Sequence, residues 1–191
     1  MNMKIRFSPP ATLMPSRALA RFDLLEHNLC VAFNRTSRRV AVRRFFAMIS
    51  RLGDGVFWYV LMATLAMTQG SSGRVAALQM ALTALAGVAI YKLLKNRLVR
   101  ERPFISYGDI ECGTPPLDRY SFPSGHTLQA VLFTTLALAW FPALAVVLLP
   151  FTLLVALSRV ILGLHYPTDV LVGAGIGWGL ASIALWVQPA L

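Results

Sequence analysis

The sequence predicts an all-α protein built as a polytopic transmembrane helix bundle. Of its 191 residues, 57% are apolar and only 14% are charged, whereas soluble domains carry roughly 25% charged residues. A soluble domain of this length could not bury so much apolar surface in one core. In addition, four long tracts contain no Lys, Arg, Asp or Glu: residues 55–73, 75–91, 120–158 and 170–191.

A bilayer core about 30 Å thick needs about 20 mostly apolar residues per helical span. We therefore expect five spans, at about 55–69, 74–94, 126–141, 144–163 and 169–187. Turn-like sequences at 70–73 and 140–142 separate neighbouring spans. A sixth span would require residues 40–54 to cross the membrane, and the three arginines and Asp54 in that stretch make this costly.

The formal net charge of +10 is concentrated near the N-terminus. Residues 1–54 hold ten basic and three acidic residues, and residues 92–119 hold six basic and four acidic residues. The high apolar content excludes a disordered chain and argues against a soluble nucleic-acid-binding protein. The expected partners are membrane lipids.

Residues 1–54 are predicted to form a basic N-terminal segment, and residues 55–191 the transmembrane domain. Residues 1–17 contain three prolines and no continuous apolar run, which is not typical of a signal peptide. Between Ala18 and Phe33, apolar residues recur at helical spacing with polar residues between them. This pattern predicts an amphipathic helix that lies in the membrane interface or packs on the outer surface of the bundle.

Three groups of polar residues flank the predicted spans. Lys95 precedes an Arg102-Pro103 pair by seven residues, residues 123–126 read Pro-Ser-Gly-His, and Ser158-Arg159 is followed by His165 and Asp169. With five spans, the loops at 95–125 and 164–168 emerge on the same side of the bundle. Ionisable residues gathered at the ends of membrane helices are usually functional.

The residue types in these groups suit a phosphate site. Arginine offers paired donors to phosphate oxygens, and lysine acts as a point charge. A helix N-terminus adds backbone N–H donors. The candidate phosphate ligands are Lys95, Arg102, Ser124, Gly125 and Arg159.

Two histidines and a carboxylate suit phosphoryl transfer. A neutral His165, with its other ring nitrogen held by Asp169, would be an activated nucleophile. His126 would then be free to protonate the leaving oxygen. The polar loops contain no carboxylate pair at a spacing suited to Mg²⁺, and we expect no metal or other cofactor.

Simpler interpretations exist for several residues. Arg97 and Arg100 have the position of snorkelling membrane anchors. Ser124 could act only as a helix cap, and Ser158 could support Arg159 or pack its own helix. His27 is expected at the interface, and Cys30 and Cys112 are expected to be free thiols. The glycines of the last span favour close helix packing over phosphate binding: Gly173, Gly175, Gly177 and Gly179.

Taken together, the three groups resemble the signature of the type 2 phosphatidic acid phosphatase family, which is related to the vanadium haloperoxidases. The family pattern is Lys-x6-Arg-Pro, Pro-Ser-Gly-His and Ser-Arg-x5-His-x3-Asp. The sequence matches it without departure as KNRLVRERP, PSGH and SRVILGLHYPTD, and the resemblance covers roughly residues 50–187. A three-part match in order and spacing is far more specific than any single motif.

The resemblance implies a metal-independent membrane phosphatase that acts on lipid phosphates. His165, oriented by Asp169, would form a phosphohistidine, and His126 would serve as acid and then as base. The substrates would include undecaprenyl pyrophosphate, phosphatidylglycerol phosphate and phosphatidic acid, with the first favoured. The alternatives are a lipid-to-lipid phosphotransferase with the same site and a non-enzymatic bundle that binds anionic lipid.

The expected location is a bacterial inner membrane. With five spans, the basic N-terminal segment and the active site share one side, so the positive-inside rule predicts a cytoplasm-facing site. The family resemblance favours the outer face instead, and a sixth span would reverse the orientation. A reporter fused to the C-terminus separates the two, because a cytoplasmic C-terminus means an outward-facing site.

Overall fold

The protein is a bundle of helices in a computed structural model that describes residues 17–116 and 118–187. Residues 1–16 of the predicted basic segment lie outside the described residues. The α-helices are α1 (Arg17–Asn34), α2 (Val40–Leu52), α3 (Val56–Thr68), α4 (Gly70–Arg97), α5 (Pro103–Ser106), α6 (Gly125–Trp140), α7 (Ala145–Ile161) and α8 (Pro167–Val187). The prediction of an all-α bundle is confirmed, and each of the five predicted spans contains one helix.

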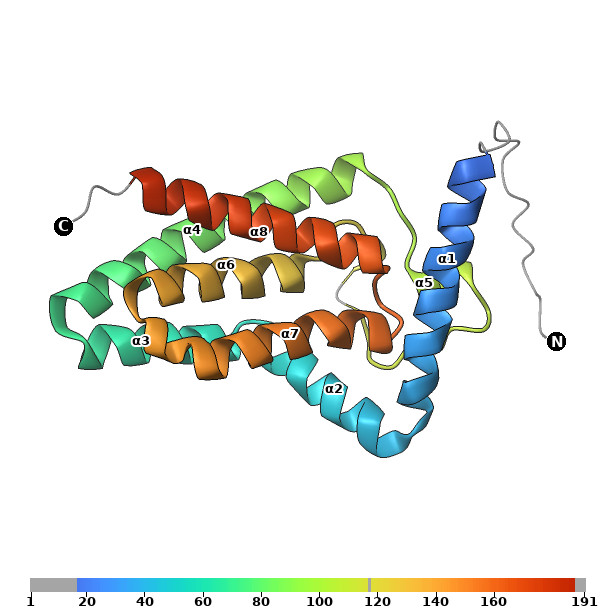
Figure 1. Ribbon diagram of the computed structural model, residues 1–191, viewed down its shortest axis with the longest axis horizontal. Coiled ribbons are helices and arrows are strands. Elements are labelled where there is room, and N and C mark those ends of the chain that lie inside the picture. Colours follow the sequence, from blue (N-terminus) through green and yellow to red (C-terminus); the bar gives the residue numbers. More distant parts are fainter. Residues whose placement is uncertain (1–16, 117, 188–191) are drawn as a thin grey trace.

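Five helices run along the long axis of the molecule, and the chain passes back and forth through α3, α4, α6, α7 and α8 (Figure 1). Helix α6 packs against α4, α7 and α8 and so occupies the centre. Helix α1 crosses one end of the bundle, where it contacts α7 and α8. The end of α8 at Val187 lies at the opposite end of the bundle (Figure 1).

Three helices are long and apolar enough to cross a membrane by length and composition: α4, α7 with the short turn before it, and α8. A fourth span results if α2 and α3, which meet at 47°, are one broken span. Helix α6, at 16 residues, is about 24 Å long at 1.5 Å per residue. Its neighbours surround it, so it traverses the bundle without having to match the full bilayer thickness.

The bend between α2 and α3 falls at residues 53–55. Gly55 has φ +140°, a conformation that side-chain-bearing residues rarely adopt. Residues 40–54, which the sequence analysis considered as an extra span, therefore form a helix that leads at an angle into α3. The turn leaves Asp54 at the mouth of the bundle, and this position matters for the site.

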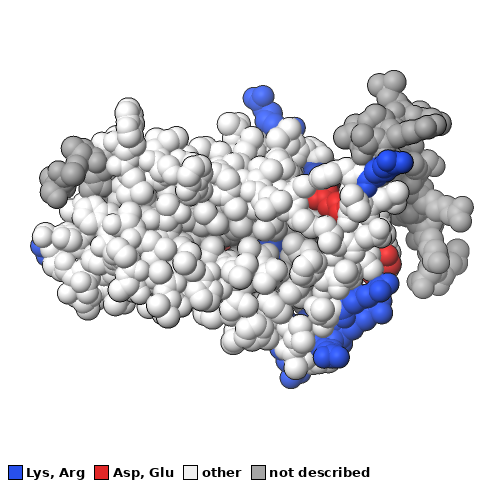
Figure 2. Space-filling view, in the orientation of Figure 1, with Lys and Arg blue, Asp and Glu red and all other residues white. Residues whose placement is uncertain are grey.

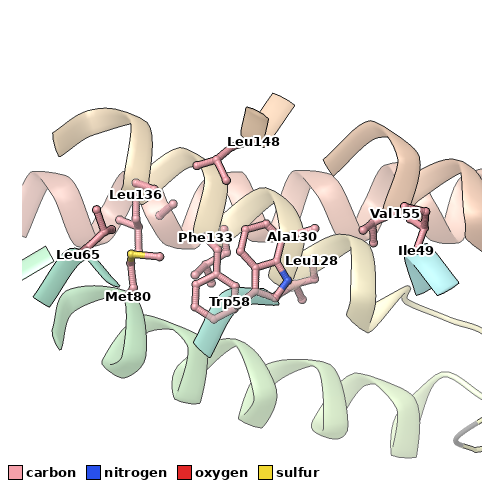
Figure 3. Packing of buried hydrophobic residues seen from close by; sticks show 13 residues of the cluster. Ile49, Trp58, Leu65, Met80, Leu128, Ala130, Phe133, Leu136, Leu148 and Val155 are labelled. Carbon is pink, nitrogen blue, oxygen red and sulfur yellow. The ribbon is translucent and has the colours of Figure 1, made fainter. Parts of the chain in front are cut away.

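The apolar core lies between α3, α4, α6 and α7. Trp58 on α3 stacks on Phe133 of α6 with ring centres 5.1 Å apart, and Met80, Leu136 and Leu148 are buried near them (Figure 3). Burial of aromatic and branched side chains at this density fixes the helices relative to one another.

Helices α6 and α8 approach closely because of two glycines. A Cβ atom at Gly173 would lie 2.5 Å from the carbonyl oxygen of Ser124, and one at Gly177 would lie 2.2 Å from that of Leu128. The predicted packing role is confirmed for these two residues, whereas Gly175 and Gly179 face open space. The close approach also lets Ser124 N–H donate to the Asp169 carbonyl at 3.0 Å, which links the starts of the two helices.

The surface divides into an apolar length and a charged end. On the face shown in Figure 2, Lys, Arg, Asp and Glu gather mainly at the end where α1 and α2 lie, and most of the remaining length of the bundle carries none. Large apolar side chains are exposed along the helices, among them Leu78, Leu85, Val146, Leu153 and Ile183. Such a continuous apolar surface is suited to lipid rather than to water.

Helix α1 confirms the predicted amphipathic helix but orients it in an unexpected way. Phe22, Leu25 and Leu29 are exposed, whereas Glu26 and Cys30 are buried against the bundle. Glu26 and Cys30 therefore make internal contacts, while the outward side of the helix carries both large apolar residues and polar ones such as Asp23. Cys30 and Cys112 are both free thiols, as expected.

Candidate active site

One cavity of about 350 Å³ opens among α3, α4 and α6 and reaches the loops at the α1 end of the bundle. Charged and histidine side chains from six separate segments line one end of it: Asp54, Lys95, Arg102, Asp118, His126, Arg159 and His165. The expectation that the polar groups converge on one side of the membrane domain is confirmed. The remaining walls are mostly apolar.

Lys95 and Arg102 share a carboxylate partner that the sequence analysis missed. Asp118 accepts from Lys95 Nζ at 2.6 Å and from Arg102 Nη2 at 2.8 Å. Burial raises the pKa of Asp118, but these two cations outweigh that effect and hold it below its usual range. Asp118 was one acid among four in a polar loop, and no spacing pattern distinguished it.

Arg159 is buried at the wall of the cavity. Its Nη1 donates to the hydroxyl of Ser50 on α2, while its Nε has no hydrogen-bond partner among residues 17–116 and 118–187. A buried guanidinium N–H without an acceptor is costly, and an anion in the cavity would supply one. Ser158 donates to the Val155 carbonyl at 2.6 Å, which favours its helix-packing interpretation.

His165 lies in the turn between α7 and α8. The turn depends on Gly163, whose φ of +71° and contact with the Glu111 carbonyl leave no room for a side chain. Arg102 Nη1 lies 3.1 Å from His165 Nε2. Because a guanidinium only donates, Nε2 must carry the lone pair and Nδ1 the proton.

Burial lowers the pKa of His165 well below its usual range, and the charges of Arg159 and Arg102 lower it further. The imidazole is therefore neutral at neutral pH. The lone pair of Nε2 faces the cations of the cavity, which is the position required of a nucleophile toward a phosphorus atom bound between them.

Asp169 faces His165, although the predicted hydrogen bond is not formed. His165 Nδ1 lies 3.7 Å from Asp169 Oδ2, and Nδ1 has no hydrogen-bond partner in the described part of the chain. Oδ2 instead accepts from the Tyr166 N–H at 2.9 Å, and Oδ1 accepts from Arg100 at 2.8 Å. His165 and Asp169 are therefore neighbours, but the distance between Nδ1 and Oδ2 is about half an ångström longer than in a good hydrogen bond.

The contacts of Arg100 differ from those predicted from the sequence. Its guanidinium pairs with Asp169 and with Glu26 and lies 3.7 Å above the Tyr166 ring. The interpretation of Arg100 as a snorkelling anchor is wrong, because two buried carboxylates compete with the lipid surface for its charge. Arg97, at the end of α4 three residues earlier, is exposed, as expected of a membrane anchor.

The Pro-Ser-Gly-His group forms the start of α6. Ser124 is the N-cap, and its buried hydroxyl faces Thr127, so this side chain is not part of the cavity wall. Gly125 and His126 do line the cavity. The role of Ser124 as a phosphate ligand stays a prediction, and the structure gives it the role of capping the helix.

His126 has a carboxylate partner in Asp54, with 3.2 Å between Nε2 and Oδ1. From the sequence, Asp54 was expected only to make a sixth membrane span through residues 40–54 energetically costly. Its position at the mouth of a span, on the side of the three motifs, was the signal that could have identified it.

The other end of the cavity is apolar. It continues along α3, α4 and α6 between Trp58, Met62, Ala84, Val88 and Phe133. Within the described residues, no group of three His, Cys, Asp or Glu side chains is arranged to hold a metal ion. The cavity thus joins a cationic site to an apolar groove.

Comparison with known proteins identifies the family. The PAP2 superfamily matches residues 76–191, which is more than half of the chain and includes all three polar groups. The chain belongs to the PAP2 superfamily. The resemblance inferred from the three motifs is therefore confirmed, and the match begins within α4.

Two curated relatives align with about half of this chain, and nearly two fifths of the aligned residues are identical. Phosphatidylglycerophosphatase B of Escherichia coli (strain K12) is 37% identical over 104 residues, which is 52% of this chain and 40% of the relative. Decaprenylphosphoryl-5-phosphoribose phosphatase of Mycobacterium tuberculosis is 39% identical over 98 residues, which is 50% of this chain and 51% of the relative. The chain thus spans about half or less of the length of these relatives.

Two solved structures share the fold. The crystal structure of Aquifex aeolicus LpxE has a TM-score of 0.73 and 26% identity, and covers 83% of this chain and 93% of that chain. A transmembrane PAP2 type phosphatidylglycerolphosphate phosphatase from Bacillus subtilis has a TM-score of 0.69 and 23% identity, with coverage of 90% and 86%. The second likeness concerns the fold alone. This PAP2 protein is accordingly a membrane protein with the bundle of its family.

Proposed function

We propose that the protein is a membrane phosphatase that hydrolyses a phosphate monoester or pyrophosphate on a lipid. The observation that carries the proposal is the cavity, which joins three cations and two histidines at one end to an apolar groove at the other. A phosphoryl group suits the first end and a hydrocarbon tail suits the second. The two curated relatives, whose names describe phosphatases of lipid phosphates, agree with this substrate class.

In the first step, Nε2 of His165 would attack phosphorus, and the bond from phosphorus to the lipid oxygen would break. His126 would give its proton to that leaving oxygen, and its Nε2 lies 3.2 Å from the carboxylate of Asp54. Lys95, Arg102 and Arg159 would offset the negative charge on the phosphoryl oxygens.

In the second step, water would attack the phosphohistidine. His126, now neutral, would take a proton from the water as its oxygen bonds to phosphorus, and the N–P bond to His165 would break. Inorganic phosphate would leave, and Nε2 would regain its lone pair. Each group would return to its starting protonation state, and Lys95, Arg102 and Arg159 would supply the positive charge that a metal ion supplies in other phosphatases.

Phosphate release from a panel of lipids tests the proposal. The purified protein in lipid nanodiscs would be given undecaprenyl pyrophosphate, phosphatidylglycerol phosphate and phosphatidic acid. We expect release from at least one of them, retained in EDTA, and a loss of about 10³-fold or more in His165→Ala. His27→Ala is the matched control, because His27 contacts Asp109 and Tyr107 outside the cavity.

Three outcomes would contradict the proposal. Phosphate that appears only on an added lipid alcohol would indicate a phosphotransferase. Tight binding of anionic lipid without any turnover would indicate a non-enzymatic bundle. Full activity in a folded His165→Ala variant would remove the proposed nucleophile, whichever lipid is used.

A further inference from the structure

Helix α1 reaches the candidate active site through one buried carboxylate. Glu26 is 4% exposed, and its oxygens accept from Arg100 Nη2 at 2.5 Å and from the Thr168 backbone N–H at 3.0 Å. The Thr168 hydroxyl also donates to it. A side chain from α1 therefore caps the first turn of α8, the turn that carries Asp169.

Arg100 connects this carboxylate to the site. Its Nη1 donates to Asp169 Oδ1 and to Thr168 Oγ1, both at 2.8 Å, while Nη2 holds Glu26. One guanidinium thus compensates two carboxylates, of which Asp169 is fully buried. The planar, forked donors of arginine suit this bridging role, which an ammonium group would fill less well.

The orientation of the Asp169 carboxylate decides its distance to His165. Oδ1 is held by Arg100, and Oδ2 faces His165 Nδ1 at 3.7 Å. Arg100 on Oδ1 and the Tyr166 N–H, which donates to Oδ2 at 2.9 Å, together set the tilt of the planar carboxylate relative to the imidazole. Glu26 holds Arg100 from the opposite side.

Neither Glu26 nor Arg100 lines the cavity. A phosphoryl group bound there would contact neither of them, so any effect that they have on turnover is indirect, through Asp169 or through Tyr166, whose ring Arg100 contacts. Their substitution should consequently change the chemical step and leave binding of the phosphoryl group intact.

We propose that Glu26 and Arg100 are positioning residues, which aim the carboxylate of Asp169 at His165 and make helix α1 part of the active site. The proposal rests on the proposed phosphatase function. It assigns α1, which exposes large apolar side chains on its outward side, a second task beyond contact with the membrane surface.

Kinetics of two variants test this role. Glu26→Gln keeps the size and an acceptor for the Thr168 N–H but removes the charge that holds Arg100. Arg100→Lys keeps the charge but loses the paired planar donors that bond to Glu26 and Asp169. In each we expect kcat to fall by about tenfold, as for second-layer groups that orient a functional histidine, with KM and the inhibition constant of inorganic phosphate, the product, unchanged within about twofold.

Matched controls lie one turn away on the same helix or segment. Asp23→Asn removes a carboxylate from the exposed side of α1, and Arg97→Lys makes the same exchange at an exposed arginine. Both should keep wild-type kcat. In the double variant Glu26→Gln/Arg100→Lys, the loss should not exceed the larger single loss, because the two residues act in one chain.

The outcomes separate this proposal from the proposed function. A wild-type protein without turnover of any lipid phosphate overturns the function itself. An active wild type whose Glu26 and Arg100 variants match their controls overturns the positioning role alone. A rise in KM or in the inhibition constant of inorganic phosphate with kcat unchanged also overturns it, since that would mean a role in binding the phosphoryl group.

Discussion

The two ends of the cavity differ in how tightly their side chains are constrained. At the charged end, most of the cations and both histidines have a named polar partner, and Asp118 alone holds two of the cations. At the apolar end, Met62 and Phe133 are positioned by packing, and Trp58 adds to its packing one hydrogen bond from Nε1 to the Gly53 carbonyl at 3.3 Å. Directional hydrogen bonds fix a geometry, whereas apolar contacts fix only a volume.

This difference separates two tasks. Under the proposed function, the charged end would bind the phosphoryl group that all lipid phosphates share. The apolar end has few directional contacts and would select among lipids by the shape of the tail. We therefore expect substitutions at the charged end to affect every substrate and those at the apolar end to affect only long-tailed ones.

Among the substitutions that compare the two ends of the cavity, Arg159→Lys, which keeps the charge but removes the planar donors, is expected to have the largest effect. Loss of one donor to a developing oxyanion costs about 10²-fold in rate, and we expect kcat/KM to fall by this factor for lipid and short-chain phosphates alike. Steady-state phosphate release measures it. Arg74→Lys, at an exposed arginine of the opposite end, is the control, and a loss confined to long-tailed substrates would break the comparison.

At the apolar end, Ala84→Leu adds volume to the groove wall. Each added methylene displaces tail surface worth about 0.8 kcal/mol, so we expect KM for a long-tailed lipid phosphate to rise by about tenfold or more. A water-soluble short-chain phosphate should be hydrolysed as by the wild type. Ala86→Leu makes the same exchange on an exposed side of α4, outside the cavity.

Equal losses for long and short substrates in Ala84→Leu would contradict the division of tasks. They would mean that the groove wall also positions the charged end. An unchanged KM for the long-tailed lipid would place the tail outside this groove.

The pH profile is expected to show the smallest effect. His165 must be neutral to attack phosphorus, and burial together with Arg159 and Arg102 lowers its pKa. The acid limb of kcat/KM should thus lie below pH 6.5, the ordinary value for histidine. A bound phosphoryl group offsets the cations and raises this pKa, which should move the acid limb of kcat to higher pH than that of kcat/KM.

Profiles of both constants between about pH 4 and about pH 8 test the expectation, because kcat/KM reports the free enzyme and kcat the complex. A kcat/KM limb at or above pH 6.5 would mean that the cations do not act on the nucleophile. Acid limbs of kcat and kcat/KM that lie at the same pH would mean that the bound phosphoryl group does not offset the charge of the cations.

Much of the architecture could be predicted from the sequence because each signal is local. Charge-free tracts located the five long helices of the bundle, and the apolar period in residues 18–33 located α1. Gly173 and Gly177 indicated close helix packing, although only the structure separated them from Gly175 and Gly179. These properties depend on residues near one another in the chain.

The errors and omissions at the site have one common cause. Arg100 was interpreted as a membrane anchor, and the partners Glu26, Asp54 and Asp118 were not recognised as part of the site. Each pairs with a residue far away in the sequence, for instance Glu26 with Arg100 across 74 positions. A single acidic residue in a polar segment carries no pattern from which such a partner can be read.

The sequence by itself determined the membrane bundle, the family and the cationic and histidine residues of the candidate site, because these follow from composition and from fixed spacing. Only the tertiary structure decided which carboxylates hold those cations, which side of α1 faces inward and where the apolar groove meets the charged end. These features depend on distances between separate helices. Such distances are set by packing, which no spacing along one segment encodes.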